Sequence, residues 1–215
     1  MIKLHCFGES GNAYKAALSL ELSKADWEPI YVDFFNGQTR TPEFRELNVM
    51  GEVPVMEDGD LILTQSGVIQ DYVSSKTGKL GGRSAAERRD VLRWMFFDNH
   101  KVSGVAGPLR YLMNFLPEEK RNADVNAFSL NRLKGALTIL DTQLAETPYL
   151  TGDALTIADI ANCGYLYYPE PFGFDRSEFP HVDAWLDRIS NTPGWKHPYD
   201  PVSYTHLTLP TTPYV

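Results

Sequence analysis

The chain has 215 residues, with 28 acidic side chains against 20 lysines and arginines, so its formal charge is −8. Hydrophobic residues make up 43% and charged residues 22%, which is the composition of a globular protein with one or two domains. The acidic balance argues against a nucleic-acid-binding protein, which would carry a basic face. The longest uninterrupted apolar run, Trp94–Phe97, is too short to cross a membrane.

The N-terminus leads directly into a strand-like stretch, Ile2–Cys6, without the layout of a signal peptide. The two cysteines, Cys6 and Cys163, lie far apart and have no spacing typical of a metal site. We therefore expect no metal, and we expect both cysteines to be buried, reduced thiols in a cytoplasmic protein.

Residues 1–77 alternate strand and helix patterns in the order βαβαββα. Asp58-Gly59 is a hairpin turn signal between the last two strands. The first two strands, joined through a helix, must be parallel and the last two antiparallel, which predicts an α/β domain. The expected strands are 2–6, 29–32, 54–57 and 61–64, and the expected helices are 10–24, 42–47 and 65–75.

Three glycines within Thr77–Gly82 indicate a linker, which we place at residues 78–84. After the linker the strand patterns stop, and apolar residues recur at helical spacing, as in the leucines from Leu130 to Leu144. Residues 85–200 are therefore predicted to form an all-α domain, with a break near Gly104–Pro108.

Three motifs in the first domain have alternative interpretations. Pro54 stands at a strand entrance, where the Val53–Pro54 peptide is either trans or, as in a minority of X-Pro bonds, cis. A cis bond would expose the backbone of Val53 to an extended peptide ligand. Ser66 and Ser10-Gly11-Asn12 each precede a helix, where they act either as simple N-caps or as part of an anion site. A thiol held next to Ser10-Gly11-Asn12 would lose its proton more readily, because the helix N-terminus stabilises the thiolate.

The order of elements and these motifs together resemble the glutathione S-transferase family over about residues 1–199. The capping-box sequence Thr156–Asp159, which by itself indicates only a helix start, belongs to the same pattern. The resemblance to a bacterial, serine-type branch of the family lies in Ser10–Lys15 (SGNAYK), Arg40–Phe44 (RTPEF), Arg93–Phe97 (RWMFF) and Gly173–Asp175 (GFD).

The resemblance implies an α/β thioredoxin-like N-terminal domain, residues 1–77, that binds glutathione, followed by an all-α C-terminal domain that shapes the pocket of the second substrate. It also implies a cytoplasmic, homodimeric transferase of the detoxification type. Its substrates would be glutathione and a small hydrophobic electrophile, and no metal would be needed.

The same resemblance assigns roles along the glutathione molecule. Ser10 would hydrogen-bond the sulfur, with Asn12 as a second donor close by. The backbone of Val53 would pair with the cysteinyl part. We therefore predict that the Val53–Pro54 peptide, which stands before a hairpin in a thioredoxin-like order, is cis. The remaining candidates bind the ends of the tripeptide: Gln65 and Ser66 at the γ-glutamyl end and Gln38 at the glycyl end.

Two residues depart from the pattern of the family. Glu52 stands where relatives usually carry Lys, Arg or Gln, and it would repel the glycyl carboxylate. Gln65 replaces a common Glu and so loses a charge that pairs with the γ-glutamyl amine. The candidates for the second-substrate pocket are His100, Tyr111 and Tyr165.

The favoured reaction is attack of the glutathione thiolate on a small electrophile. Two alternatives stay open: a glutathione-dependent disulfide reductase, and a binding protein that keeps the fold without the chemistry. Residues 201–215 are left out of this reasoning, because Val202–Thr211 fits no helix or strand and resembles a translated sequencing adapter. A natural Thr/Pro-rich tail is the other interpretation of that segment.

Overall fold

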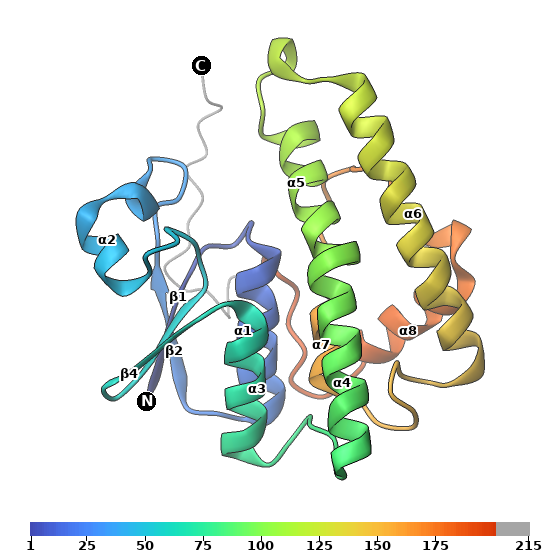
Figure 1. The fold of residues 1–215 in the computed structure, drawn as a ribbon, viewed down its shortest axis with the longest axis horizontal. Helices are drawn as coiled ribbons and strands as arrows, with labels where there is room; N and C mark the ends of the chain where they lie inside the picture. The colour runs from blue at the N-terminus through green and yellow to red at the C-terminus, as the bar shows by residue number, and fades with distance from the viewer. Residues whose placement is uncertain (201–215) are drawn as a thin grey trace.

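The computed structural model describes residues 1–200, so the adapter-like segment lies outside the described residues. An α/β unit and a bundle of helices lie side by side, with α1 and α3 between the sheet and the bundle (Figure 1). Among residues 1–200, no helix is both long and apolar enough to cross a membrane.

The α/β unit has the expected order of elements. Its sheet has the strand order β2-β1-β3-β4, in which β1 and β2 are parallel and β3 is antiparallel to both β1 and β4. The expected α/β fold is therefore confirmed. The elements are β1 (Ile2–Cys6), α1 (Gly11–Ser23), β2 (Trp27–Tyr31), α2 (Pro42–Leu47), β3 (Val55–Asp58), β4 (Leu61–Thr64) and α3 (Ser66–Thr77).

The second strand begins at Trp27, earlier than the expected residue 29, so that Pro29 lies inside it opposite Leu4. A proline is tolerated there because β2 is an edge strand and has a neighbour on one side only.

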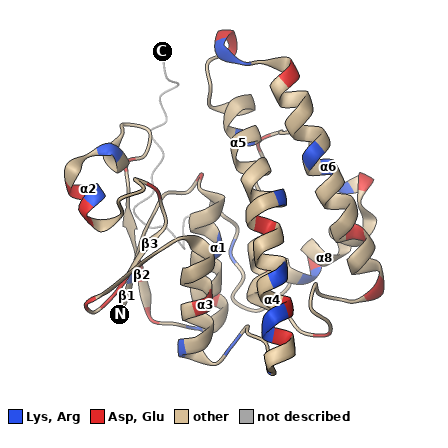
Figure 2. Cartoon of the chain, viewed as in Figure 1, with Lys and Arg blue, Asp and Glu red and all other residues tan. Residues whose placement is uncertain are grey.

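The rest of the described chain is helical, as expected. The α-helices are α4 (Ala85–Phe97), α5 (Ser103–Asn114), α6 (Ala123–Glu146), α7 (Ile157–Cys163) and α8 (Pro180–Ser190). Residues 78–84 connect α3 to α4, and a short π-helix, Asp98–Val102, joins α4 to α5. Acidic and basic residues lie close together on α4 and between α5 and α6 (Figure 2).

The predicted break near Gly104–Pro108 is wrong in position. The regular helix is interrupted earlier, at the π-helix, and Pro108 lies inside α5. Pro108 has no backbone N–H to donate to the carbonyl of Gly104, four residues earlier. Gly104 is exposed, so water can hydrogen-bond to this carbonyl instead. Gly104 instead allows a close approach, because a Cβ there would lie 2.4 Å from the carbonyl oxygen of Asn99.

Helix α1 is buried on both sides. Leu20 faces the core beneath the sheet, whereas Tyr14 and Leu18 belong to the core of the helical unit. The two cysteines are buried in these cores, as expected. Burial raises the pKa of the Cys6 thiol to about 12 and also raises the pKa of Cys163, which keeps both thiols protonated at neutral pH.

The capping box forms as predicted and also joins helices. Asp159 accepts the backbone N–H of Thr156 at 2.9 Å, and Thr156 caps α7 in return. The same carboxylate accepts the backbone N–H of Leu150 at 2.9 Å and the indole N–H of Trp185 at 3.0 Å. This side chain therefore fixes α7 against the preceding loop and against α8.

Candidate functional site

A cavity of about 430 Å³ lies between the two units, next to the carboxyl ends of β1 and β2. A smaller cavity of about 30 Å³ adjoins it, and both are lined by Asn12, Glu52, Val53 and Asn99. The larger cavity is mainly apolar, whereas amides, a hydroxyl and a carboxylate line the smaller one. The α/β unit lines the larger cavity with Phe7, Glu9, Ser10, Asn12, Phe34, Phe35, Glu52 and Val53.

The structure brings most of the predicted site residues together at these cavities. Ser10 lines the larger cavity, and the smaller cavity is completed by Asn48, Pro54, Gln65 and Ser66. Gln38 is placed differently: its side-chain oxygen accepts the backbone N–H of Asp33 at 2.7 Å, within its own exposed loop.

Ser10 is both an N-cap and a wall of the cavity. Its Oγ accepts the backbone N–H of Ala13 at 3.2 Å, which caps α1, and the residue is 8% exposed. Because the oxygen accepts this bond, the hydroxyl hydrogen remains available to a group in the cavity. The N-cap and binding interpretations of the sequence are therefore compatible at this residue.

Asn12 is oriented by a buried ion pair that the sequence analysis missed. Its Oδ1 accepts from Lys15 Nζ at 3.2 Å, which leaves the amide NH₂ group for other partners. Lys15 Nζ also lies 2.5 Å from Asp98, whose other oxygen accepts the hydroxyl of Ser103 at 2.6 Å. Burial raises the pKa of Asp98, and its contacts with Lys15 and Ser103 oppose that rise.

The strand entrance has the predicted cis bond, between Val53 and Pro54. The preceding carbonyl, that of Glu52, accepts from the side chain of Asn48 at 2.8 Å. At the other end of the smaller cavity, Gln65 has a positive φ of 70°, which is uncommon for a residue other than glycine. Ser66 begins α3 directly after it, so a helix N-terminus points into this region.

An aromatic cluster forms the apolar side of the larger cavity and joins the two units. Phe7 stacks on Phe34 with ring centroids 4.7 Å apart. Phe35 contacts Phe115 of the helical unit at 5.6 Å, and Tyr111 stacks on Phe115 at 6.3 Å. One signal was available in the sequence, since Phe7 and Phe34 follow parallel strands whose carboxyl ends share one edge of the sheet.

The candidates for a second-substrate pocket lie in different places. Tyr111, which is 43% exposed, lines the cavity together with the buried Tyr165. Burial raises the pKa of Tyr165 to about 12, so its phenol stays protonated at neutral pH. His100 is exposed on the π-helix, and Asn99 forms the cavity wall at that helix.

Acidic groups dominate the charge at the site. Glu9 and Glu52 line the larger cavity, and burial raises the pKa of Glu9. The cation among the lining residues, Arg110, is paired with Glu170 at 2.7 Å. Within residues 1–200, no group of His, Cys, Asp and Glu side chains is arranged to hold a metal ion.

These features define a class of protein. A thioredoxin-like sheet unit supplies a cis-proline entrance and a hydroxyl at a helix N-terminus, and a helical unit completes the cavity with aromatic side chains. Such an arrangement suits two ligands side by side: a small polar ligand with an extended backbone, and a second, apolar ligand.

Comparisons with known proteins agree with this class. The family model "Glutathione S-transferase, N-terminal domain" matches residues 2–75, and "Glutathione S-transferase, C-terminal domain" matches residues 109–193. A crystal structure of glutathione S-transferase from Pseudomonas fluorescens Pf-5 is 32% identical with a TM-score of 0.86, covering 93% of this chain and 99% of that chain. The chain belongs to the glutathione S-transferase family.

Two curated relatives carry different names. A probable glutathione S-transferase of Oryza sativa, GSTF1, is 28% identical in an alignment 213 residues long that covers 91% of this chain and 95% of that protein. Elongation factor 1-gamma 3 of the same species is 32% identical in an alignment 203 residues long that covers 90% of this chain but only 47% of that protein.

Proposed function

We propose that the chain is a glutathione transferase in which Ser10 stabilises the glutathione thiolate for attack on a small hydrophobic electrophile. The observation that carries this proposal is the place of the Ser10 hydroxyl. It lies at the N-terminus of α1, on a cavity with a polar side and an aromatic side. A role in detoxification in the cytoplasm and membership of the bacterial serine-type branch are parts of the same proposal.

In this proposal the tripeptide lies along the smaller cavity. The backbone of Val53 pairs with its cysteinyl part, and Gln65 and Ser66 hold its γ-glutamyl end. The sulfur then lies near Ser10 and Asn12. The electrophile lies against the aromatic cluster, where Tyr111 and Tyr165 contact it.

The energetic demand on the site is modest. A free thiol has a pKa of about 8.5, and lowering it to about 6–7 requires roughly 2–3 kcal/mol. A hydrogen bond from the Ser10 hydroxyl and the positive end of the α1 dipole are together of that size. The thiolate sulfur then forms a bond to the electrophilic carbon. The bond from that carbon to the leaving group breaks, and its electron pair stays on the leaving group.

The test replaces Ser10 by alanine. In Ser10→Ala we expect turnover at neutral pH to fall about 10- to 100-fold while glutathione binding changes little, because the hydroxyl acts on the thiolate. The pH–rate profile should move to higher pH. Ser84→Ala is the matched control, since Ser84 caps α4 in the same way and does not line the cavity. An unchanged pH profile would move the role to Asn12 or to backbone N–H groups.

We also propose that the active form is a homodimer. Val68 on α3 and Leu92 and Phe96 on α4 are exposed apolar residues that line a cavity of about 360 Å³. A second copy of the chain would cover this face. Light scattering should report twice the chain mass, and Phe96→Glu should shift the protein to the monomer.

A second candidate is a binding protein without turnover. The departures at Glu52 and Gln65, which both line the smaller cavity, support it, because repulsion of the glycyl carboxylate and loss of a partner for the γ-glutamyl amine weaken the exact placement of glutathione that turnover needs. Retention on immobilised glutathione without conjugation of an aryl halide would favour this candidate. Reduction of a mixed disulfide in the same assays would instead favour the reductase.

A further inference from the structure

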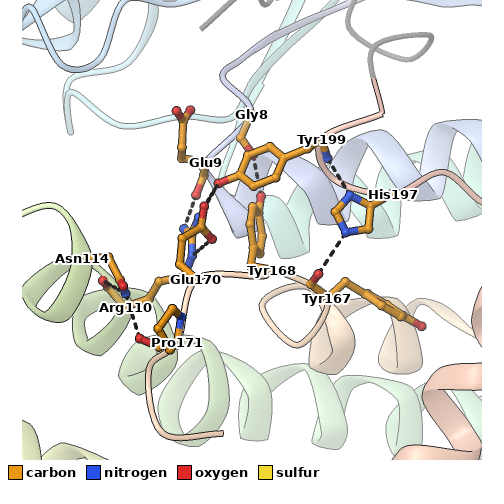
Figure 3. A network of polar contacts seen from close by, with 10 residues as sticks. All are labelled: Gly8, Glu9, Arg110, Asn114, Tyr167, Tyr168, Glu170, Pro171, His197 and Tyr199. Carbon is orange, nitrogen blue, oxygen red and sulfur yellow. Dashed lines mark hydrogen bonds and ion pairs between the residues drawn. The ribbon is translucent and has the colours of Figure 1, made fainter. Parts of the chain in front are cut away.

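Arg110 of α5 is a buried cation with partners in every direction (Figure 3). Its Nε and Nη2 donate to one carboxylate oxygen of Glu170 at 3.0 and 2.7 Å, and Nη2 also donates to the hydroxyl of Tyr199 at 2.6 Å. The guanidinium plane lies over the ring of Tyr168, 3.9 Å from its centroid. The remaining nitrogen, Nη1, donates to the backbone carbonyl of Glu9 at 2.8 Å.

These partners come from segments that are far apart in the sequence. Tyr168 and Glu170 follow α7, and Tyr199 belongs to the segment after α8. The Tyr199 hydroxyl also donates to the second oxygen of Glu170 at 2.6 Å. The segment is held further by His197, which accepts the backbone N–H of Tyr199 at Nδ1 and donates from Nε2 to the carbonyl of Tyr167 (Figure 3).

The network acts on the turn that carries Ser10. Tyr168 donates its hydroxyl to the carbonyl of Gly8 at 2.7 Å, and Arg110 fixes the next carbonyl, that of Glu9. The Glu9 carbonyl and the Ser10 N–H belong to one peptide plane, so fixing the carbonyl also fixes the entry of the chain into Ser10. Two successive carbonyls of this turn are therefore held by side chains of the helical unit.

We propose that Arg110 is a positioning residue, which sets the Ser10 hydroxyl against the sulfur through the carbonyl of Glu9. This inference rests on the proposed function. Arginine suits the task because its planar fork binds a carboxylate, a hydroxyl and a carbonyl at once while stacking on an aromatic ring. Lysine keeps the charge but not this geometry. A displacement of the Ser10 hydroxyl by about 1 Å is large on the scale of a productive hydrogen bond.

The experiment uses the full chain and compares Arg110→Lys with Tyr199→Phe, which removes one hydroxyl and keeps the ring. We expect Arg110→Lys to lower kcat about tenfold with little change in KM for the electrophile. The thiol of bound glutathione, titrated by its thiolate absorbance, should lose its proton at higher pH. Tyr199→Phe should change both quantities in the same direction by a smaller factor. The control is Arg176→Lys, since Arg176 is an ion-paired arginine on the surface, in contact with Asp183 and Asp187.

A double variant separates positioning from a merely structural role. In a Ser10→Ala background, Arg110→Lys should cause no further shift of the thiol titration, because its effect acts through Ser10. A lower melting temperature with an unchanged titration would overturn the inference, as would a full shift in the Ser10→Ala background. If the unaltered protein neither binds nor conjugates glutathione, the proposed function fails first, independently of Arg110.

Discussion

Within residues 1–200, two ion pairs with buried cations lie beside the site, and they are built differently. Lys15 of α1 pairs with Asp98 of the helical unit, whereas Arg110 and Glu170 both belong to the helical unit. Lys15 and Asp98 have side chains that are 1% and 4% exposed, so both charges are removed from water. Arg110 is equally buried at 3%, but the side chain of its partner Glu170 is 25% exposed.

This difference separates stability from positioning. Lys15 is a compact charge whose partners, Asn12 and Asp98, leave little access for water. Loss of either charge of that pair would leave the other buried and unpaired. Arg110 is a rigid fork that holds backbone as well as side chains, and water can reach Glu170 if the pair is lost. We therefore expect the first pair to control folding and the second to control the geometry of Ser10.

The largest effect should follow from breaking the first pair. Lys15→Met should lower the free energy of unfolding by about 3–5 kcal/mol, because it leaves Asp98 without its cation. The double variant Lys15→Met/Asp98→Asn should recover more than half of that loss, since neither position then carries a buried charge. Urea denaturation of both variants measures the two values. A loss below about 1 kcal/mol in the single variant would mean that the pair is solvated, and the contrast with Arg110 would disappear.

A smaller effect should come from the contact between α1 and Tyr165, whose ring centroid lies 5.9 Å from Lys15 Nζ. A Cβ at Gly11 would lie 2.7 Å from the Tyr165 ring, so Gly11→Ala should cost about 1–3 kcal/mol of stability. Turnover should fall as well, because Gly11 follows Ser10. Gly135→Ala is the control: nothing lies within 4 Å of its added Cβ, and alanine should stabilise α6 by about 0.5–1 kcal/mol. Equal melting temperatures for the two variants would contradict this packing.

The acidic side of the site can be tested at Glu52, which is exposed. Glu52→Lys should tighten glutathione binding several-fold, less so at high salt, because it replaces repulsion of the glycyl carboxylate by attraction. Glu52→Gln should recover part of that gain. Calorimetry at two ionic strengths gives the affinities. Equal or weaker binding by Glu52→Lys at low salt would show that the glycyl end lies elsewhere, and the fold assignment would be unaffected.

The smallest effect should be a pH dependence at Glu9. Burial raises the pKa of its carboxyl, so the folded chain binds this proton more tightly than the unfolded chain does. Stability should therefore fall as the pH rises from the ordinary pKa of a glutamate through the raised value. Glu9→Gln should flatten this part of the stability curve and leave the acid side unchanged. A steeper fall in the variant would contradict the direction of the shift.

Much of the fold could be predicted because its signals are local. Alternation of apolar residues depends on neighbours two to four positions away, and it placed the strands and helices of the α/β unit within about two residues. The hairpin at Asp58-Gly59 and the cap at Ser10 depend on the backbone preferences of single residues. The cis bond before Pro54 was predicted from its place before a hairpin in a thioredoxin-like order, because the strand-entrance motif by itself favours the trans form.

The sequence by itself thus determined the order of elements, the helix caps at Ser10 and Thr156, and the identity of most polar residues at the smaller cavity, whereas the N-cap of α3 is Gln65 and not Ser66. Tertiary structure alone decided which charges meet: Lys15 and Asp98 are 83 positions apart, and Arg110 and Glu170 are 60 apart. No local pattern marks such partners, because a buried ion pair exists only after the chain has excluded water around it. The break predicted near Gly104 was wrong in position because the need for glycine there also arises only in the folded chain, where a Cβ would lie too close to the carbonyl oxygen of Asn99.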